Sequence, residues 1–433
     1  MPARCQHSGP FHPNYIDTMG LAPVNHPRFI FISRRILAPS RLTMQHRIVV
    51  KEKGRYNAFP VLNQLPDGRL TIGCISSPFG DHYGLAGWLT FESRDHGRTW
   101  TPSEDPMLPP NWPGTSPRER YDRLSGVLPD GTLMAVGSVG QEIWPLDRRE
   151  EAEARSLRFV DDETYTSRFP GKLIISGYRL SVIRSRDGGH TWDRRTWTVS
   201  GYESAVGFPR GTVLEDGTWL FPVYTTRAGG ESDCLLFRSS DDGETWHLHE
   251  AVPRIGSEWA LVETEPNRVL GHIRSTCYWD PAAVERTYHR DRFYTMEVWS
   301  EDGGSTWTSP IEASFEGYPN HLLKLRDGRI LCTYGYRRAP MGIRALISED
   351  GGRTWDTDHE YVLRDDGGGV SSAWPPEKRP RMGGADVGYP ISAELDDGTM
   401  LTVYYITTED ETTHVAATLW HPDRDRPPGP RGG

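Results

Sequence analysis

The sequence predicts an all-β protein built from one repeated four-stranded antiparallel unit. Two short phrases that recur along the chain indicate this fold, and the composition agrees with it. The 433 residues include 45 Gly, 34 Pro, 15 Trp and 18 Tyr, which means many turns and many large packing side chains. This profile is typical of β proteins rather than helical ones.

The first phrase is Ser-x-Asp-x-Gly-x-Thr-Trp. Its five copies are Ser93–Trp100, Ser185–Trp192, Ser239–Trp246, Ser300–Trp307 and Ser348–Trp355. We expect each copy to form a hairpin turn, because Asp can accept hydrogen bonds from turn N–H groups, Gly permits a positive φ and Trp begins the returning strand. These residues are therefore interpreted as structural.

The second phrase is apolar-x-Asp-Gly-x-x-apolar, a hairpin signal that precedes the first phrase. It occurs at Asp67-Gly68, Asp130-Gly131, Asp216-Gly217, Asp327-Gly328 and Asp397-Gly398. Together the phrases describe four antiparallel strands joined by hairpins, which is one propeller blade. Blades beginning near residues 56, 122, 207, 257, 318 and 388 predict a six-bladed β-propeller of four-stranded blades with five such hairpins.

The propeller is expected to occupy residues 46–421, with Arg47–Lys51 as an extra strand that pairs with the last blade. Residues 1–45 are expected to form an N-terminal extension, in part disordered, and residues 422–433 a Pro/Gly/Arg-rich tail. The second blade carries extra chain at about 140–179, including the charged run Arg148–Arg155. That run predicts a solvated helix face or, alternatively, a loop at the rim of the pocket.

Composition excludes several classes of protein. Lys and Arg number 49 against 59 Asp and Glu, a formal charge of −10 that argues against a nucleic-acid or anionic-membrane partner. No stretch approaches about 18 apolar residues, so no transmembrane helix is expected. The five scattered cysteines lack CxxC spacing and no histidine cluster has ligand spacing, so we expect no disulfide framework, metal or cofactor. No secretory signal is present as the sequence is written, which predicts a cytoplasmic protein.

The first phrase is the Asp box, and five boxes at blade spacing resemble the sialidase (neuraminidase) superfamily of six-bladed propellers. The resemblance covers residues 46–421. It implies a glycoside hydrolase with a carbohydrate partner, a terminal glycan or oligosaccharide. Asp boxes also occur in other glycosidases, in lyases and in non-enzymatic propellers, so the functional prediction depends on the inner strands.

Two inner strands resemble the segments that carry the family's nucleophile. Tyr389 lies eight residues before Asp397 and is similar to the nucleophilic tyrosine, while Glu258 lies eight before its own turn position and is similar to the glutamate that activates it. Equivalent positions of inner strands should point inward together. A sialic acid carries a carboxylate on its anomeric carbon, which would repel a carboxylate nucleophile. The resemblance therefore implies a Tyr389/Glu258 pair acting with retention.

In this family three arginines hold the substrate carboxylate, since the planar guanidinium binds it bidentately and stays charged. Arg274 resembles one of them, and Arg337 or Arg338 resembles another, with no spacing that chooses between the two. The family's Phe-Arg-Ile-Pro signature would place the third at position 58, which is Ala58 here. Arg55 is a nearby candidate, although its strand parity is opposite to that of Ala58.

The remaining candidates lie in loops and strand entries. Asp81, after the first hairpin, matches the family's general acid/base, and His82 could serve instead because its unperturbed pKa suits proton transfer near neutral pH. The alternative for Asp81 is a turn residue. Further candidates for substrate contact, each with a structural role as the alternative, are Asp122, Arg123, Arg210 and His321.

These residues favour an exo-acting, retaining, sialidase-like glycoside hydrolase that removes a terminal acidic sugar. Two alternatives stay open. One is a glycosidase or polysaccharide lyase acting on a different sugar, such as a uronate or rhamnose, for which the same residue types would serve. The other is a non-catalytic glycan-binding propeller, for which the Asp boxes alone would suffice. The sequence does not indicate an oligomeric state.

Overall fold

The computed structural model describes residues 44–65, 67–78, 88–103, 124–128, 130–139, 142–154, 158–159, 171–176, 179–188, 191–202, 204–207, 211–226, 232–249, 256–275, 277–278, 287–288, 294–374 and 386–429. These residues belong to the compact unit Leu42–Gly433. Strands make up most of this part of the chain, beside one short α-helix and two 3-10 turns. The prediction of an all-β protein is confirmed.

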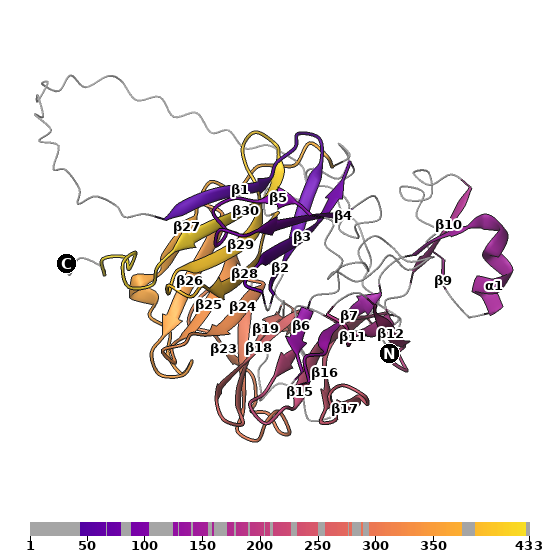
Figure 1. The fold of residues 1–433 in the computed structure, drawn as a ribbon. Helices are drawn as coiled ribbons and strands as arrows, with labels where there is room; N and C mark the ends of the chain where they lie inside the picture. The colour runs from indigo at the N-terminus through magenta and orange to yellow at the C-terminus, as the bar shows by residue number, and fades with distance from the viewer. Residues whose placement is uncertain are drawn as a thin grey trace, which may run out of the picture. The chain divides into compact units, whose positions relative to one another are not determined.

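In these residues, antiparallel groups of strands follow one another along the chain (Figure 1). The first three are β2 (Tyr56–Gln64), β3 (Leu70–Ser77), β4 (Trp88–Ser93) and β5 (Thr101–Pro102); β6 (Leu124–Val127), β7 (Leu133–Val139), β11 (Arg179–Ser185) and β12 (Asp193–Trp197); and β13 (Ser204–Gly207), β14 (Thr212–Val213), β15 (Trp219–Thr226), β16 (Ser232–Ser239) and β17 (His247–His249). The first strand of each group lies near a predicted inner strand.

The later groups have the same up-and-down order. They are β18 (Trp259–Glu265), β19 (Arg268–Ser275), β22 (Tyr294–Ser300) and β23 (Ile311–Glu312); β24 (Asn320–Lys324), β25 (Ile330–Tyr336), β26 (Gly342–Ser348) and β27 (Tyr361–Arg364); and β28 (Val387–Glu394), β29 (Met400–Thr407), β30 (Thr413–Trp420) and β1 (Gln45–Val50). A separate short pair, β20 (Cys277–Tyr278) and β21 (Thr287–Tyr288), follows β19, and the 3-10 turn η3 (Thr357–His359) precedes β27.

The two ends of the strand series meet in one sheet. β1 pairs antiparallel with β30, with Ile48 opposite Ala416, and β30 also meets β2 through the parallel pair Tyr56 and Thr413. Figure 1 shows indigo β1 running beside yellow β30. The pairing predicted between Arg47–Lys51 and the last group is thereby confirmed. It covers a strand edge that would otherwise be open to association.

The five Asp-box turns share one set of internal hydrogen bonds. In the first, the Asp95 carboxylate accepts from the backbone N–H of Thr99 at 2.9 Å and from its hydroxyl at 2.7 Å, while Ser93 Oγ accepts from the N–H of Gly97 at 2.9 Å. The N–H bond to the carboxylate recurs at Asp187, Asp241, Asp302 and Asp350. Burial alone would raise the pKa of Asp95, but these hydrogen bonds lower it to about 2. The predicted turn role of the Asp is confirmed.

Hydrophobic cores join different groups of strands. One core combines Leu270 of β19 with Leu322 of β24 and with Trp355 of the following Asp box. Another combines Tyr56 of β2 with Tyr405 of β29. Burying one large apolar side chain stabilises a fold by about 1.5–3 kcal/mol. Packing in these cores therefore fixes β19 relative to β24 and β2 relative to β29.

The predicted extra chain of the second unit forms a small sheet of its own. It contains β8 (Glu142–Pro145), the 3-10 turn η2 (Leu146–Arg148), α1 (Arg149–Ala154), β9 (Arg158–Phe159) and β10 (Lys172–Ser176). Trp144, Ala152 and Leu173 form its core, and Arg148 bonds Glu151 at 2.8 Å on the exposed side of the helix. The charged run is a solvated helix face here, the first of its two predicted forms.

The beginning of the predicted C-terminal tail is attached to the group β24–β27. The Tyr361 hydroxyl donates to the carbonyl of Pro422 at 2.6 Å, and Arg426 bonds Asp356 at 2.7 Å.

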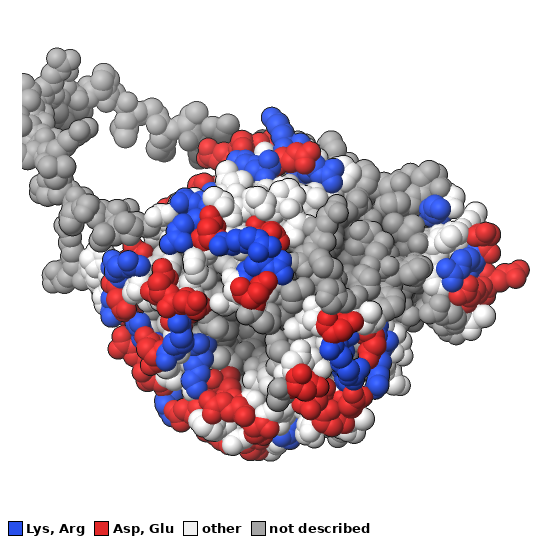
Figure 2. All heavy atoms as spheres, viewed as in Figure 1, with Lys and Arg blue, Asp and Glu red and all other residues white. Residues whose placement is uncertain are grey.

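Figure 2 shows Lys and Arg side chains interspersed with Asp and Glu over the described surface of one face. None of the helices in the described segments is long and apolar enough to cross a membrane.

Candidate active site

Tyr389 leaves its strand at a bulge. The β28–β29 ladder shifts register between Gly388 and Ile391, and Tyr389 has a φ of 52°. A left-handed backbone costs a residue with a Cβ about 1–2 kcal/mol, so surrounding contacts must hold it there. Gly388, with a φ of 137°, permits the approach to this bend. The bend takes the tyrosine out of the regular alternation of the strand.

Glu258 and Arg274 are cross-strand neighbours at the start of β18 and the end of β19. The backbone N–H of Arg274 donates to the carbonyl of Glu258 at 2.7 Å, and the N–H of Ser257 donates to the carbonyl of Arg274 at 2.8 Å. A Cβ on Gly256 would lie 2.2 Å from that carbonyl oxygen. Glycine is therefore required where the chain enters the strand beside Glu258.

The side chains of Tyr389, Glu258 and Arg274 meet. The Tyr389 hydroxyl donates to Glu258 Oε1 at 2.6 Å, and Arg274 Nη1 donates to Glu258 Oε2 at 2.7 Å. The same Arg274 nitrogen lies 3.4 Å from the tyrosine oxygen. Glu258 is only 8% exposed and Arg274 is partly exposed. One carboxylate thus bridges a phenol and a guanidinium in a largely buried cluster.

Electrostatics keep the phenol neutral and the guanidinium charged. Burial raises the pKa of Tyr389 above its ordinary value and the Glu258 carboxylate raises it further, although Arg274 opposes this. Burial would lower the pKa of Arg274, but Glu258 and the nearby tyrosines raise it above its ordinary value. The resting phenol therefore holds its proton, and a base lies within hydrogen-bond distance to take it.

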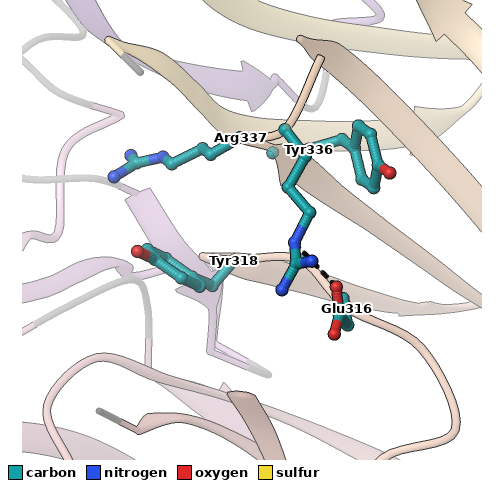
Figure 3. A pocket seen from close by; sticks show the side chains of 7 residues that line it. Glu316, Tyr318, Tyr336 and Arg337 are labelled. Atoms are coloured by element: carbon teal, nitrogen blue, oxygen red, sulfur yellow. Dashed lines mark ion pairs between the residues drawn. The ribbon is translucent and has the colours of Figure 1, made fainter. Parts of the chain in front are cut away.

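Arg337 completes the cluster from the end of β25. Its Nε donates to the carbonyl of Val387 at 3.0 Å, and its guanidinium carbon lies 5.0 Å from the centre of the Tyr318 ring and 5.9 Å from that of Tyr389. Arg274 lies over the same Tyr318 ring at 4.4 Å. Figure 3 shows Arg337 and Tyr318 reaching to the same side, with Tyr336 pointing the other way. The guanidinium groups of Arg274 and Arg337 thus both pack against the Tyr318 ring.

Spacing could not choose between Arg337 and Arg338, but in the structure their side chains point in different directions. Arg338 is 44% exposed and forms an ion pair with Glu316 at 2.8 Å, the dashed contact in Figure 3. Tyr318, Arg337 and Arg338 help to line a hollow of about 10 Å³, the room of one water molecule. Arg337 therefore lies at Tyr389, whereas Arg338 lies on the rim.

The first strand departs from the arginine pattern, as its sequence indicates. Ala58 is fully buried in the core with Tyr56 and Phe59. Arg55 is bound instead to Ser76, with Nε 3.0 Å from the hydroxyl and Nη2 3.2 Å from the carbonyl oxygen. The position where the family signature would have an arginine is apolar here.

The other candidates are only partly described. His321 is 9% exposed in β24, and its Nδ1 accepts from the N–H of Ser392 at 3.4 Å, a structural hydrogen bond. The candidates that lie outside the described residues are Asp81, His82, Asp122, Arg123 and Arg210. Within the described segments, no group of three or more His, Cys, Asp or Glu side chains could hold a metal ion.

Sequence reasoning missed the aromatic residues around Tyr389. Tyr318 was not among the site candidates, yet its ring lies beneath both Arg274 and Arg337. Phe59 packs edge-on against Tyr389 with ring centres 4.7 Å apart, and Tyr405 stacks on it at 5.9 Å. One signal could have found two of them: an aromatic residue followed by proline recurs at Phe59, Tyr318 and Tyr389.

Comparison with known proteins gives one family model and several distant relatives. Residues 170–403 match the family model described as a BNR repeat-like domain. A sialidase of Bacteroides fragilis is 24% identical over 222 residues, which cover 47% of this chain and 38% of that protein. A sialidase of Clostridium perfringens is 23% identical over 252 residues, covering 55% and 61%. The chain thus spans less than two thirds of the length of either relative.

Solved structures share the fold over most of the chain. A protein of unknown function from Dyadobacter fermentans has a TM-score of 0.62 at 22% identity, covering 87% of this chain and 97% of that one. An intramolecular trans-sialidase from Ruminococcus gnavus has 0.54 at 15%, covering 86% and 96%. An α-L-arabinanase from Penicillium chrysogenum has 0.51 at 12%, covering 88% and 99%.

Proposed function

The chain belongs to the BNR repeat-like domain family of the sialidase superfamily, and from that premise we propose that it is a retaining exo-glycoside hydrolase with Tyr389 as nucleophile. The family and the all-β fold agree with a glycoside hydrolase. The proposal adds that the strand groups form six propeller blades and that the substrate is a terminal acidic sugar.

One observation carries the proposal: the Tyr389 hydroxyl donates to Glu258 at 2.6 Å while Arg274 holds the other carboxylate oxygen at 2.7 Å. A neutral phenol is a poor nucleophile until a base takes its proton. Glu258 is in place to take it, and the adjacent Arg274 would stabilise the negative charge that develops on the phenol oxygen.

In the proposed reaction the Tyr389 oxygen attacks the anomeric carbon as its proton passes to Glu258. The glycosidic bond breaks, and the leaving oxygen takes a proton from a general acid, for which Asp81 and His82 are the sequence candidates. The glycosyl–tyrosine intermediate is then hydrolysed by water, whose proton goes to that conjugate base while Glu258 returns its own to Tyr389. Two displacements at one carbon give retention.

The arginines support an anionic substrate group. Arg337 uses its Nε on the carbonyl of Val387, so its two terminal nitrogens can face a carboxylate bidentately. Arg274 contributes charge from the neighbouring strand. Because position 58 is a buried alanine, we propose that two described arginines, rather than three, hold the acidic group. A uronate or another sugar acid is therefore as suitable a substrate as a sialic acid.

The test is release of fluorophore from aryl glycosides of sialic acid, a uronic acid, rhamnose and arabinose, comparing wild type with Tyr389→Phe. Tyr361→Phe is the matched control, since its hydroxyl donates to the carbonyl of Pro422 in the tail. We expect one acidic glycoside to be cleaved, the activity to vanish in Tyr389→Phe and to persist in Tyr361→Phe, and NMR to show the retained anomer first.

Other outcomes would redirect the proposal. An unsaturated uronate product would indicate a lyase, and cleavage of a neutral sugar alone would remove the acidic substrate. Full activity in Tyr389→Phe would refute the nucleophile. Glycan binding without any turnover would support a non-catalytic module instead.

A further inference from the structure

We propose that Asp386 is a positioning residue that acts through Tyr405 to hold the Tyr389 phenol against Glu258. This inference rests on the proposed function of Tyr389. It concerns Asp386 and the aromatic residues packed around Tyr389.

Asp386 is a buried carboxylate three residues before Tyr389. It is 4% exposed, and its Oδ1 accepts from the hydroxyls of Tyr405 and Tyr56, each at 2.9 Å. Its Oδ2 accepts from the indole N–H of Trp374 at 3.2 Å. Three donors from different parts of the chain thus converge on one side chain. Burying a carboxylate is costly unless such hydrogen bonds satisfy it, so this arrangement fixes all four residues.

Tyr56 and Tyr405 stay protonated and donate hydrogen bonds to Asp386. Burial raises the pKa values of Tyr56 and Tyr405 well above the ordinary value, and the Asp386 charge raises both further. Their hydroxyl protons therefore stay in the hydrogen bonds to Asp386. The Tyr405 ring is held in one orientation by its own hydroxyl.

Tyr405 transmits this orientation to Tyr389. The two rings stack at 27° with centres 5.9 Å apart. The Phe59 ring packs against both, with its centre 4.7 Å from that of Tyr389 and 5.0 Å from that of Tyr405. Tyr405 is 1% exposed and Phe59 7%. Close-packed buried rings leave little room for the Tyr389 ring to shift.

Such a support is needed because the Tyr389 backbone is strained. At a φ of 52° the residue would relax if nothing opposed it. A catalytic group displaced by about 1 Å can lose about 100-fold in rate even when substrate still binds. A support behind Tyr389 therefore acts on the chemical step more than on substrate affinity.

The molecule offers a matched pair of variants. Tyr405→Phe and Tyr56→Phe each delete a hydroxyl that bonds the same Asp386 oxygen at the same 2.9 Å, from residues that are both fully buried. Only the Tyr405 ring stacks on Tyr389; the Tyr56 ring packs on Phe59, Tyr405 and Trp374. We expect both variants to lose similar stability, since each loses one buried hydrogen bond.

The kinetic expectation separates the pair. With the aryl glycoside that the wild type cleaves, Tyr405→Phe should lower kcat by about 10- to 100-fold with KM within about 2-fold, whereas Tyr56→Phe should stay within about 3-fold in both. Asp386→Asn, which replaces an acceptor by a group that also donates, should lower kcat as Tyr405→Phe does. Equal kcat values in the two tyrosine variants would overturn the proposal.

A second measurement needs no substrate. 3-Fluorotyrosine placed at position 389 reports the ring environment by ¹⁹F NMR of the intact chain. We expect one sharp resonance in the parent and in Tyr56→Phe, and a displaced or doubled resonance in Tyr405→Phe and in Asp386→Asn. Identical spectra throughout would refute the positioning role even if every glycoside proved inert, and displaced spectra on an inert protein would refute only the proposed hydrolase.

Discussion

The strands β2 and β28 contain the same backbone bend with different surroundings. In β2 the bend is at Phe59, with a φ of 53°, and in β28 at Tyr389, with a φ of 52°. Each aromatic residue precedes a proline and lies eight residues before the Asp of its Asp-Gly turn. Each ladder slips register at the bend. The backbone device is the same in both strands.

The difference lies in what the neighbouring strands offer. Tyr389 meets the carboxylate of Glu258 and two arginines. Phe59 contacts the rings of Tyr56, Tyr389 and Tyr405 and belongs to an apolar core. The bend therefore sets the orientation of the aromatic side chain, and the charged residues from other strands determine how its environment differs. Phe59 packs against Tyr389, the residue at the equivalent position of β28.

The largest expected effect comes from removing the partner that distinguishes β28. Glu258→Gln keeps the shape but cannot take the phenol proton, so we expect kcat to fall by about 10³-fold. Glu263→Gln, in β18, is the control, since that buried carboxylate accepts from the N–H groups of Asn267 and Glu215 in two different turns. It should lower the melting temperature and leave kcat within a few-fold. Retained activity in Glu258→Gln would contradict its role as the base.

The arginines beside the two bends should differ next most. Arg337→Gln removes a guanidinium that faces the site, so we expect KM for the acidic aryl glycoside to rise by about 10- to 100-fold. Arg55→Gln removes one that bonds Ser76 beside β2, and KM should change by less than about 2-fold. Steady-state kinetics of both variants decide this. A similar rise in both would place Arg55 in the site after all.

A smaller effect is expected from the residue before each aromatic. Gly388→Ala puts a Cβ on a backbone with a φ of 137°, which an alanine rarely adopts, so the bend should shift and kcat should fall by about 10-fold. Ala58→Gly makes the opposite change in β2 and should cost only about 0.5–1 kcal/mol of stability, with kcat unchanged. Kinetics and urea unfolding test both. An unaffected kcat in Gly388→Ala would show that the bend does not position Tyr389.

The smallest expected effect is on stability at high pH. Tyr389 has a raised pKa in the folded chain against about 10 in the unfolded one. Below pH 10 the phenol is protonated in both states; above it the unfolded chain releases the proton first, so the free energy of unfolding falls as pH rises. Tyr389→Phe should make this fall shallower by up to about 1.4 kcal/mol per pH unit, and Phe59→Tyr should make it steeper.

Urea unfolding between about pH 9 and 11 measures these slopes. Tyr202→Phe is a control because its hydroxyl bonds Asp233 in another group of strands. Parallel curves for wild type and Tyr389→Phe would mean that the phenol titrates alike in both states.

Local sequence was sufficient for the repeated hairpins. In each Asp box the Asp bonds the N–H four residues later, as from Asp95 to Thr99, so every partner lies inside the phrase that predicts it. The β1–β30 pairing was also predictable, because β1 alternates as a strand does and precedes the first repeat, so the last group of strands was its expected partner. Short-range hydrogen bonds and strand periodicity are written in consecutive residues.

The site needed more than that. Register counting placed Tyr389 and Glu258 on inner strands, but their contact joins residues 131 apart, and spacing could not choose Arg337 over Arg338. That choice follows from the turn after β25, which sends one side chain to Tyr318 and the next to Glu316. Side-chain direction at a strand end depends on the packing around it and not on order in the chain.

The support behind Tyr389 was beyond the sequence altogether. Asp386 joins Tyr56, 330 residues away, to Tyr405 and Trp374. The sequence by itself determined the repeated strands, their turns and the residue types near the inner strands. Only the tertiary structure decided which of those residues touch, because the packing of one strand group on the next sets distances that no single segment contains.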